Sequence, residues 1–206
     1  MAKPPIVVGI AGGSASGKST VVHEVTRILG PGASAIVSHD AYYHDLSHMA
    51  FEERLRVNVD HPESVETSLL IEHIGELIAG RPIEVPDYDF VSQTRAARGI
   101  RVEPASVVIV EGLFTLVDER LRALLHVKAY VDTTPAQRLE RRIERDVVER
   151  GRDRPTIVHQ HETRVQPMHE RFVAPSRAHA DVLIEGGGHN VAAIAELAER
   201  VRRMLR

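Results

Sequence analysis

A glycine-rich segment near the start of the chain has residue types and spacing that suit phosphate binding. Residues 12–20 fit the pattern G-x-x-x-x-G-K-[ST], in which backbone N–H groups, a lysine and a hydroxyl surround the phosphates of a nucleoside triphosphate. An apolar run at 6–10 precedes the segment and a helical pattern at 18–29 follows it. This setting predicts a triphosphate-binding loop rather than a glycine turn that only links two elements. The predicted loop consists of Gly12, Gly13, Ser14, Ala15, Ser16, Gly17, Lys18, Ser19 and Thr20.

The positions of this loop differ in their expected chemical roles. Gly12 and Gly17 allow backbone conformations that turn successive N–H groups toward phosphate oxygens. The helix that follows adds the positive end of its dipole. Lys18 is expected to reach the β- and γ-phosphates, and the Ser19 hydroxyl is expected to bind Mg²⁺. Thr20 cannot easily replace Ser19, because one residue along a helix turns the side chain by about 100°.

Two acidic residues follow predicted strands and are placed to act beside the loop. Asp40 ends the second predicted strand, where its carboxylate can accept a proton from an attacking hydroxyl or hold a metal-bound water. Glu111 follows the apolar run at 107–110, a position in which such folds place a second Mg²⁺ contact. From the residues alone, Asp40 is equally suited to cap the next turn, and an acid after a buried strand is a common pattern.

Asp60 has two interpretations. It precedes a predicted helix within Asn58–Pro62, and this position favours a role as an N-terminal cap. The functional alternative is that its carboxylate accepts hydrogen bonds from the two hydroxyls of a ribose. From the residues alone the cap is favoured.

A segment in the second half of the chain is rich in arginine interleaved with glutamate. One interpretation is a solvated helix stabilised by ion pairs. The other is a mobile lid over about 135–155 that closes on a triphosphate. Arg138, Arg142 and Arg145 share one helical face, and Arg150-Gly-Arg152 ends the helix at a glycine hinge. Both interpretations stand equal at this point.

Alternating strand and helix patterns predict an α/β fold of the P-loop NTPase type, with a doubly wound parallel sheet and helices on both faces. Ligands are then expected beyond the carboxyl ends of the strands, where the polar residues named above fall. The expected strands are 6–10, 34–38, 107–110, 129–131 and 182–184. The expected helices are 18–29, 62–78, 118–125, 135–149, 156–169 and 190–205.

Residues 81–103 depart from this alternation. Short alternating apolar and polar pieces surround Ala97-Arg-Gly99, which suggests a β-hairpin flap. Flaps over the open end of such a sheet often cover a substrate. The alternative is a surface insertion without a role in binding.

Composition limits the class of protein. At 206 residues the chain fits a single domain, 1–206, with ordinary contents of 43% hydrophobic and 27% charged residues. A net charge of −3 argues against a protein that coats nucleic acid. The chain has no cysteine and no apolar run of membrane-spanning length. We expect a soluble cytoplasmic protein with no nucleic-acid or membrane partner. The histidines form no recognisable metal-ligand set and are expected at the surface: His44, His48, His159, His161 and His169.

Taken together, the motifs resemble those of the uridine kinase (uridine–cytidine kinase) family. They occur in family order from the first strand to the last helix, so the resemblance covers nearly the whole chain. The loop alone indicates only an NTPase, whereas the ordered set is specific to the family. The matching segments are Gly12–Thr20, Asp40-Ala-Tyr-Tyr43, Asn58-Val-Asp-His-Pro62, Val85-Pro-Asp-Tyr-Asp-Phe90, Val110-Glu-Gly112, Glu149-Arg-Gly-Arg-Asp153 and Gly187-Gly-His-Asn190.

The resemblance implies ATP-dependent phosphorylation of the 5′-hydroxyl of uridine and cytidine, by a homotetramer in pyrimidine salvage. It implies that Asp40 is the base toward that hydroxyl and lies near Mg²⁺, with Ser19 and Glu111 as further metal contacts. Asp60 would hold the ribose hydroxyls. The catalytic cations at the phosphates would be Lys18, Arg145 and Arg150. The other nucleoside contacts would be Tyr43, Tyr88, Phe90, Arg142, Arg152 and Gln160.

One position departs from the family pattern. Family members that accept uridine commonly carry histidine where this chain has Gln93, at a position that faces the 4-substituent of the base. A glutamine amide offers a donor for the uracil oxygen and an acceptor for the cytosine amine, depending on how it is turned. The resemblance and this residue together predict that both nucleosides are substrates.

Two alternative functions were weighed against nucleoside phosphorylation. A related P-loop kinase could act on another small alcohol, such as phosphoribulose or pantothenate, but the segments 58–62 and 88–90 speak against it. A nucleotide-binding regulatory module without catalysis is the second rival. The presence of Lys18, Ser19 and Asp40 weighs against that module, because a protein that only binds nucleotide does not need the base.

Overall fold

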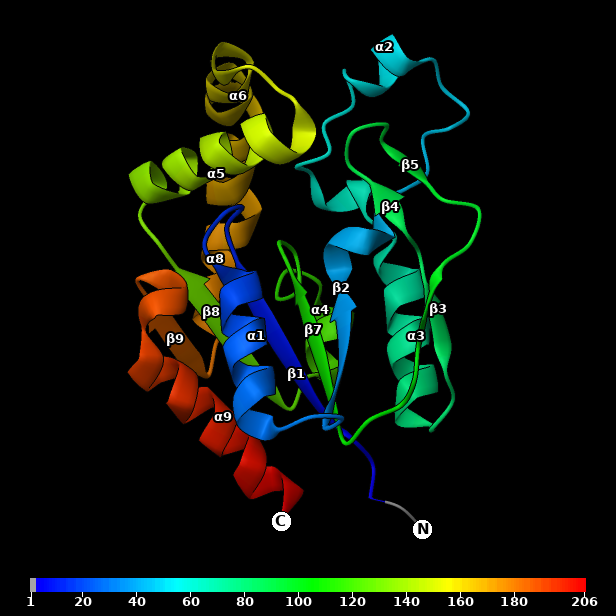
Figure 1. Cartoon of the computed structure of the whole chain (residues 1–206), viewed down its shortest axis with the longest axis vertical. Coiled ribbons are helices and arrows are strands. Elements are labelled where there is room, and N and C mark those ends of the chain that lie inside the picture. The colour runs from blue at the N-terminus through cyan, green and yellow to red at the C-terminus, as the bar shows by residue number, and fades with distance from the viewer. Residues whose placement is uncertain (1–2) are drawn as a thin grey trace.

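Five parallel strands form the central sheet of the computed structural model, which describes residues 3–206 (Figure 1). Their spatial order is β2, β7, β1, β8, β9, and every neighbouring pair is parallel. This sheet confirms the expected α/β class, and it places all five carboxyl ends at one edge, where such sheets bind ligands. The strands are β1 (Ile6–Gly12), β2 (Ser34–Ser38), β7 (Val107–Gly112), β8 (Val127–Asp132) and β9 (Val182–Glu185).

Helices cover both faces of the sheet, as the alternating pattern predicts. α1 (Lys18–Leu29) and α9 (Val191–Leu205) share one core with the even-numbered side chains of β1. α3 (Thr67–Ile78) and α4 (Glu119–Leu124) share the other core with the odd-numbered side chains of that strand. Successive side chains of a strand point to opposite faces. The unbroken apolar run of β1, buried throughout, therefore supplies both cores.

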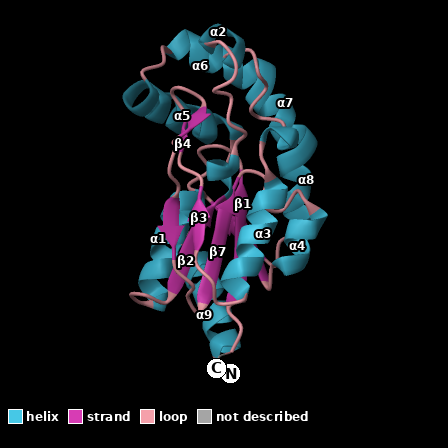
Figure 2. Cartoon of the chain, turned by 90° about the vertical axis from the view of Figure 1, so that its right-hand side faces the viewer, coloured by secondary structure: helices cyan, strands magenta, loops and turns pink. Residues whose placement is uncertain are grey.

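A helical segment lies beyond the carboxyl ends of the strands (Figure 2). It begins with α5 (Pro135–Arg150), which ends at Gly151 in a left-handed conformation with a φ of 61°. α6 (Arg154–Gln160) follows, and its N-terminal N–H of Thr156 donates to the side chain of Asp153 at 2.9 Å. The turn between the two helices brings α6 back over the same edge of the sheet.

The helix that starts with α6 continues much further than expected. The predicted end at 169 is wrong, because helical backbone runs on through the 3₁₀ turn Arg177–His179. Two π turns, His161–Val165 and His169–Val173, interrupt it. Each π turn comes just before a short helix that contains a proline, namely α7 (Gln166–Met168) and α8 (Ala174–Ser176). Proline lacks an N–H and its ring collides with the carbonyl one turn back, so the helix widens locally instead of ending. No helix among residues 3–206 is long and apolar enough to span a bilayer.

The expected helix at 62–78 is wrong in its first turn. A 3₁₀ turn at Pro62–Ser64 is followed by Val65, which forms an antiparallel bridge with Tyr43, and α3 starts only at Thr67. Helical periodicity continues through this point, but pairing with a distant residue overrides it. Three short helical elements were not expected from the sequence: the 3₁₀ turns His39–Tyr42 and Gly187–His189, and α2 (Phe51–Arg54).

Residues 81–103 form two short antiparallel ladders. In the first, β3 (Ile83–Val85) pairs with β6 (Ile100–Val102), and in the second, β4 (Tyr88–Asp89) pairs with β5 (Thr94–Arg95). The chain therefore reverses at 90–93, not around 97–99. The side chain of Asp89 accepts hydrogen bonds from the N–H groups of Val91 and Ser92 in the middle of this turn, which explains the reversal there.

We predict that the core between α9 and the sheet contributes strongly to stability. Leu197 is fully buried in that core, so Leu197→Ala should lower the free energy of unfolding by about 2–5 kcal/mol. Denaturant unfolding measures the change. Val191, on the same helix, is 76% exposed, and Val191→Ala should change the free energy by less than about 0.5 kcal/mol. Similar effects of the two substitutions would contradict the assigned packing.

Candidate active site

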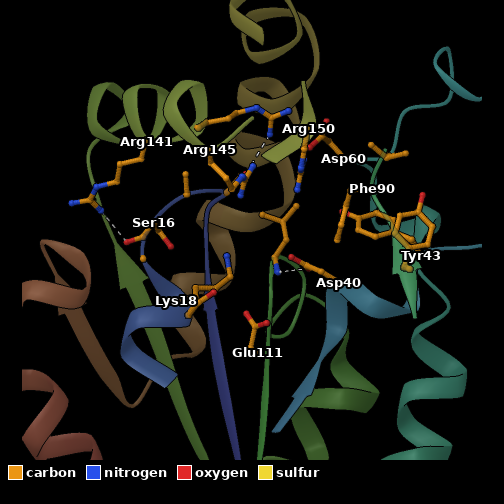
Figure 3. Close-up of a pocket in the computed structure, with 18 of the residues that line it drawn as sticks. Ser16, Lys18, Asp40, Tyr43, Asp60, Phe90, Glu111, Arg141, Arg145 and Arg150 are labelled. Atoms are coloured by element: carbon orange, nitrogen blue, oxygen red, sulfur yellow. Dashed lines mark hydrogen bonds between the residues drawn. The ribbon is translucent and has the colours of Figure 1, made fainter. Parts of the chain in front are cut away.

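A cavity of about 310 Å³ opens at the carboxyl ends of the strands, with the loop after β1 on one side and the arginines of α5 on another (Figure 3). It brings together residues that are far apart in the chain and that come from the phosphate loop, the ends of β2 and β7, the flap and α5. Most of the predicted site residues line it: Ser14, Ala15, Ser16, Gly17, Lys18, Ser19, Asp40, Tyr43, Asp60, Tyr88, Phe90, Gln93, Glu111, Arg142, Arg145, Arg150 and Arg152.

The other predicted residues lie beside the cavity instead of in its wall. Gly12 and Gly13 accept hydrogen bonds from the Lys18 ammonium through their carbonyl groups, both at 3.1 Å. Thr20 is exposed on α1. Gln160 accepts a hydrogen bond from Arg152 Nη1 at 3.4 Å, so it reaches the cavity only through that arginine.

Hydrogen bonds hold the phosphate loop in shape, and one of them lies within it, where the Ser16 N–H donates to the Gly13 carbonyl at 3.1 Å. Gly17 has a φ of 96°, a left-handed conformation that favours glycine, and α1 begins directly after it. The hydroxyl of Thr133 donates to the carbonyl of Ser16 at 2.9 Å. The first turn of α1, 18–20, contains no acidic side chain. The positive end of the helix therefore faces the cavity without an internal counter-charge, as an anion site requires.

The carboxylates of Asp40 and Glu111 come together because β2 and β7 are adjacent. Leu113 N–H donates to Asp40 Oδ1 at 3.2 Å and orients that carboxylate. Gly112 makes this approach feasible, because a Cβ there would lie 2.6 Å from His39 Cβ and 3.0 Å from Asp40 Oδ1. Figure 3 shows both carboxylates on the sheet side of the cavity, with Lys18 beside them.

This donor set fits a magnesium ion. Burial raises the pKa of Glu111, and the negative charge of Asp40 raises it further, whereas Lys18 opposes the shift. Two half-buried carboxylates that repel each other leave negative charge uncompensated, and a divalent cation would offset it. Together with the hydroxyl of Ser19, they offer the oxygen ligands that Mg²⁺ prefers.

The far side of the cavity is aromatic. Tyr43, Tyr88 and Phe90 form a cluster with ring centroids 5.1–5.9 Å apart. Gln93 lies beside it, 7% exposed and with a φ of 57°. Its Oε1 atom is buried without a hydrogen-bond partner among the described residues. This half of the cavity therefore combines flat apolar surfaces with an unpaired amide oxygen.

The interpretation of Asp60 as a helix cap is wrong. His61 occupies the cap position, and its Nδ1 accepts the N–H of Glu63 at 3.2 Å. Asp60 is 9% exposed and lines the cavity. Burial raises the pKa of Asp60, and Arg142 is the foremost of the arginines that oppose the shift. The carboxylate is therefore free of a structural role in the turn and faces the cavity.

The arginines of α5 and of the turn after it form the remaining wall. The Arg150 guanidinium stacks over the ring of Phe90 at 4.6 Å from its centroid. Burial and the neighbouring Arg145 lower the pKa of Arg150 to about 10. Arg142 Nη1 donates to Ser14 Oγ at 3.3 Å, which connects α5 to the phosphate loop. These contacts support the lid interpretation over a solvated helix, while the closing movement stays a prediction.

Arg138 shares the helical face as predicted but does not line the cavity. It is 2% exposed, and its Nη2 donates to Gln166 Oε1 at 3.2 Å. Its guanidinium packs behind the phosphate loop against Gly13. Two charged residues near the site were missed from the sequence, in addition to the apolar wall residues Val59 and Leu113. Arg141 lines the cavity and donates to the carbonyl of Ser16 at 3.4 Å.

The second missed residue is Asp146, which is fully buried among the cavity arginines. A signal for it was present. Asp146 stands four residues after Arg142 and four before Arg150, the spacing at which side chains meet on a helix. The abundance of glutamate in α5 hid the single aspartate of that helix.

The prediction that the histidines lie at the surface is wrong for His161. That residue is 6% exposed, and burial lowers its pKa. His169 is half-buried beside it, and burial together with Arg138 lowers its pKa to about 4. His44, His48 and His159 are exposed. The sequence pattern did not show that the helical segment after residue 160 buries His161 and partly buries His169.

Comparison with known proteins decides the family. Residues 7–193 match the phosphoribulokinase/uridine kinase family. The chain belongs to this family. This match, together with full-length relatives named uridine kinase, confirms the resemblance inferred from the motifs.

Relatives within the family match over the full length. A uridine kinase from Geobacillus kaustophilus is 46% identical over 205 residues, which cover 100% of this chain and 97% of that protein. A uridine kinase from Streptococcus equi subsp. zooepidemicus is 43% identical, with coverage of 100% and 99%. Among solved structures, D-glycerate 3-kinase from Cryptococcus neoformans aligns with a TM-score of 0.63 and 15% identity, covering 89% of this chain and 87% of that one. The last likeness supports the fold alone.

We predict an acid-sensitive fold at the histidine next to Asp40. Burial lowers the pKa of His39 to about 4. Between pH 6.5 and 4 the unfolded chain binds a proton that the folded chain excludes, so stability falls as the pH falls. The loss should reach about 3 kcal/mol for this group. In the wild type, His39 Nε2 lies 3.1 Å from Thr67 Oγ1. The amide of a His39→Gln variant can keep this contact but cannot take up a proton.

The measurement is denaturant unfolding of both proteins from pH 7 to pH 4. The difference between the two curves should change over this range, because the contributions of all other groups cancel. His44→Gln, at an exposed histidine, serves as the control and should leave the curve unchanged. Parallel curves for wild type and His39→Gln would show that His39 is not buried in its neutral form.

Proposed function

We propose that this protein transfers the γ-phosphoryl group of ATP to the 5′-hydroxyl of uridine and cytidine, giving UMP and CMP. The observation that carries the proposal is one cavity that joins a phosphate loop and two carboxylates to an aromatic pocket with a buried acid. The first half suits a triphosphate and its metal, and the second suits a nucleoside. Full-length relatives named uridine kinase, at 43–46% identity, support the same acceptor.

The phosphate donor is proposed to bind at the loop Gly12–Thr20. Amide groups at the start of α1 would surround the phosphates, and Lys18 would leave its two carbonyl contacts to bridge the β- and γ-phosphates. Arg145 and Arg150 would compensate charge on the transferring group from the opposite side (Figure 3). Bound Mg²⁺, held by Ser19, Asp40 and Glu111, would neutralise phosphate charge.

Asp40 is proposed to accept the proton of the attacking 5′-hydroxyl. Its Oδ1 is oriented by Leu113 N–H, so Oδ2 is the oxygen left for the proton. Transfer of that proton to the carboxylate would strengthen the hydroxyl as a nucleophile at the moment of attack. The same geometry holds the nucleophile and the phosphate in one cavity, and such positioning is the main task in phosphoryl transfer.

The nucleoside is proposed to occupy the aromatic half of the cavity. Asp60 would accept hydrogen bonds from the two ribose hydroxyls, and Tyr43, Tyr88 and Phe90 would contact the base. Arg142 and Arg152 would bind from α5 and the turn after it, with Gln160 acting behind Arg152. The buried Asp60 and the aromatic rings favour a nucleoside over phosphoribulose or pantothenate. We further propose, as the resemblance implies, that the protein is a homotetramer in the cytoplasm. Sedimentation velocity measures its oligomeric state and tests the tetramer.

A screen of nucleosides with ATP and Mg²⁺ tests the function, with ADP release as the readout. Uridine and cytidine should both be turned over, because Gln93 lines the cavity and its amide can donate or accept a hydrogen bond. Nucleosides that lack the 2′-hydroxyl should be weaker substrates, since Asp60 would lose a partner. Turnover of cytidine without detectable turnover of uridine would overturn the dual specificity. Failure of both would overturn the function.

Substitution of Asp40 tests the mechanism. Asp40→Asn keeps the size of the side chain but removes the proton acceptor, so kcat for uridine should fall by about 10²- to 10⁴-fold. Affinity for an unreactive ATP analogue, measured by calorimetry without metal, should change far less. A kcat close to the wild-type value would show that Asp40 is not the base.

A further inference from the structure

The carboxylate of Asp146 is surrounded by four guanidinium groups. Arg145 Nε donates to Oδ1 at 2.9 Å, and Arg145 Nη2 lies 2.8 Å from the same oxygen. Arg150 Nη1 lies 3.5 Å from the same oxygen. Arg142 Nε and Arg152 Nη1 each lie 3.6 Å from Oδ2. One buried negative charge thus faces four positive charges, each of which belongs to a residue in the wall of the cavity.

The backbone of the same residue stabilises the turn that brings these groups together. The carbonyl of Asp146 accepts the N–H of Gly151 and, at 3.1 Å, the N–H of Arg152. Gly151 has a φ of 61°, which reverses the chain at the end of α5. Arg150 and Arg152 are thereby turned back toward the carboxylate. Side chain and backbone of Asp146 act on the same turn.

Asp146 itself does not line the cavity. Its side chain is fully buried, and the wall consists of the arginines that surround it. A nucleoside or a triphosphate in the cavity would therefore contact the guanidinium groups and not the carboxylate. Any effect of Asp146 on the reaction must pass through those groups.

Four guanidinium groups this close repel one another unless a counter-charge holds them. Burial and the neighbouring Arg145 both lower the pKa of Arg150, whereas Asp146 opposes the shift. In the absence of the carboxylate the arginines would spread apart or turn outward. Each guanidinium is rigid and planar, so its fixed donors lose their aim when it turns. The charge of Asp146 is thus suited to keep the arginines in one arrangement.

We propose that Asp146 is a positioning residue for phosphoryl transfer, which holds Arg145 and Arg150 toward the phosphates and Arg142 and Arg152 toward the nucleoside. This inference rests on the proposed function. Asp146 contributes no contact to either substrate. It sets the geometry in which the cationic wall meets the transferring group, and it does so through its negative charge, which an uncharged amide of equal size lacks.

Asp146→Asn is the direct test. kcat for uridine should fall by about 10- to 100-fold, because misplacement of catalytic groups by about 1 Å is enough for such a loss. Affinity for an unreactive ATP analogue, measured by calorimetry, should be unchanged or tighter, since the cavity gains one net positive charge. A residue that only supports the fold would weaken binding and turnover together. Equal losses in both would overturn the proposal, and so would an unchanged kcat.

Glu144→Gln is the matched control, because it removes one negative charge from an exposed position of the same helix. It should leave kcat and analogue affinity close to wild type. A kcat loss in this variant equal to that of Asp146→Asn would overturn the specific role of the buried carboxylate.

A double substitution tests whether Asp146 acts through an arginine. On an Arg150→Ala background, Asp146→Asn should reduce kcat by a smaller factor than in the wild type, because one of its targets is already absent. Fully independent effects would overturn the proposal.

Should Asp146→Asn fail to fold, Asp146→Glu replaces it. The longer side chain keeps the negative charge but displaces the arginines, so kcat should fall while the affinity for the ATP analogue is preserved. Wild-type kcat in Asp146→Glu would then overturn the inference.

The two proposals fail in different ways. Wild-type protein that phosphorylates neither uridine nor cytidine overturns the proposed function and, with it, the role of Asp146. Wild-type turnover combined with an unaffected Asp146→Asn variant overturns only the positioning role.

Discussion

The common direction of β1, β2 and β7 is the constraint on which the site depends. β7 lies between β1 and β2 in space, although it follows both in the chain. Because parallel strands end at the same edge, this order delivers the phosphate loop, Asp40 and Glu111 to one place. Gly112 then lets the end of β2 approach closely. The separation of the reactive groups is thus set by the packing of an apolar sheet, and no substrate has to assemble them.

Charge compensation governs the side chains that this frame presents. Burial raises the pKa of Glu111 and of Asp60 and lowers that of Arg150, so each ionised group is less stable here than in water. Lys18 rests on two carbonyl oxygens and is already extended toward the cavity. A triphosphate with its cation would supply the charges that these groups lack. Electrostatic stabilisation is effective in such a site because the charged groups already line one cavity.

Local patterns were sufficient to predict the sheet, the phosphate loop and most of the helices. Apolar runs and helical periodicity report on burial within one element, which is why α1 and β2 match the expected bounds. They do not report on pairing between distant residues. The bridge between Val65 and Tyr43 therefore delays α3, and the flap reverses at 90–93, where Asp89 binds the turn.

The site shows the same division between local and distant information. Sequence motifs predicted which residues line the cavity, since each motif has its own chemistry. They did not show how those residues contact one another. The burial of Asp146 and the packing of Arg138 behind the phosphate loop depend on how α5 lies beyond the carboxyl ends of the strands. The sequence of α5 alone suits a solvated helix equally well.

The arginines of α5 connect the two halves of the cavity. Arg150 stacks on Phe90 in the aromatic half and lies 3.5 Å from Asp146, which also binds Arg145. Arg142 donates to Ser14 of the phosphate loop while its charge acts on Asp60. A nucleoside that displaces or orders the Phe90 ring would therefore act on Arg150, the cation proposed to face the phosphates. Because these cations share one counter-charge, movement of one changes the forces on the others, and the acceptor and donor sites form a single electrostatic unit.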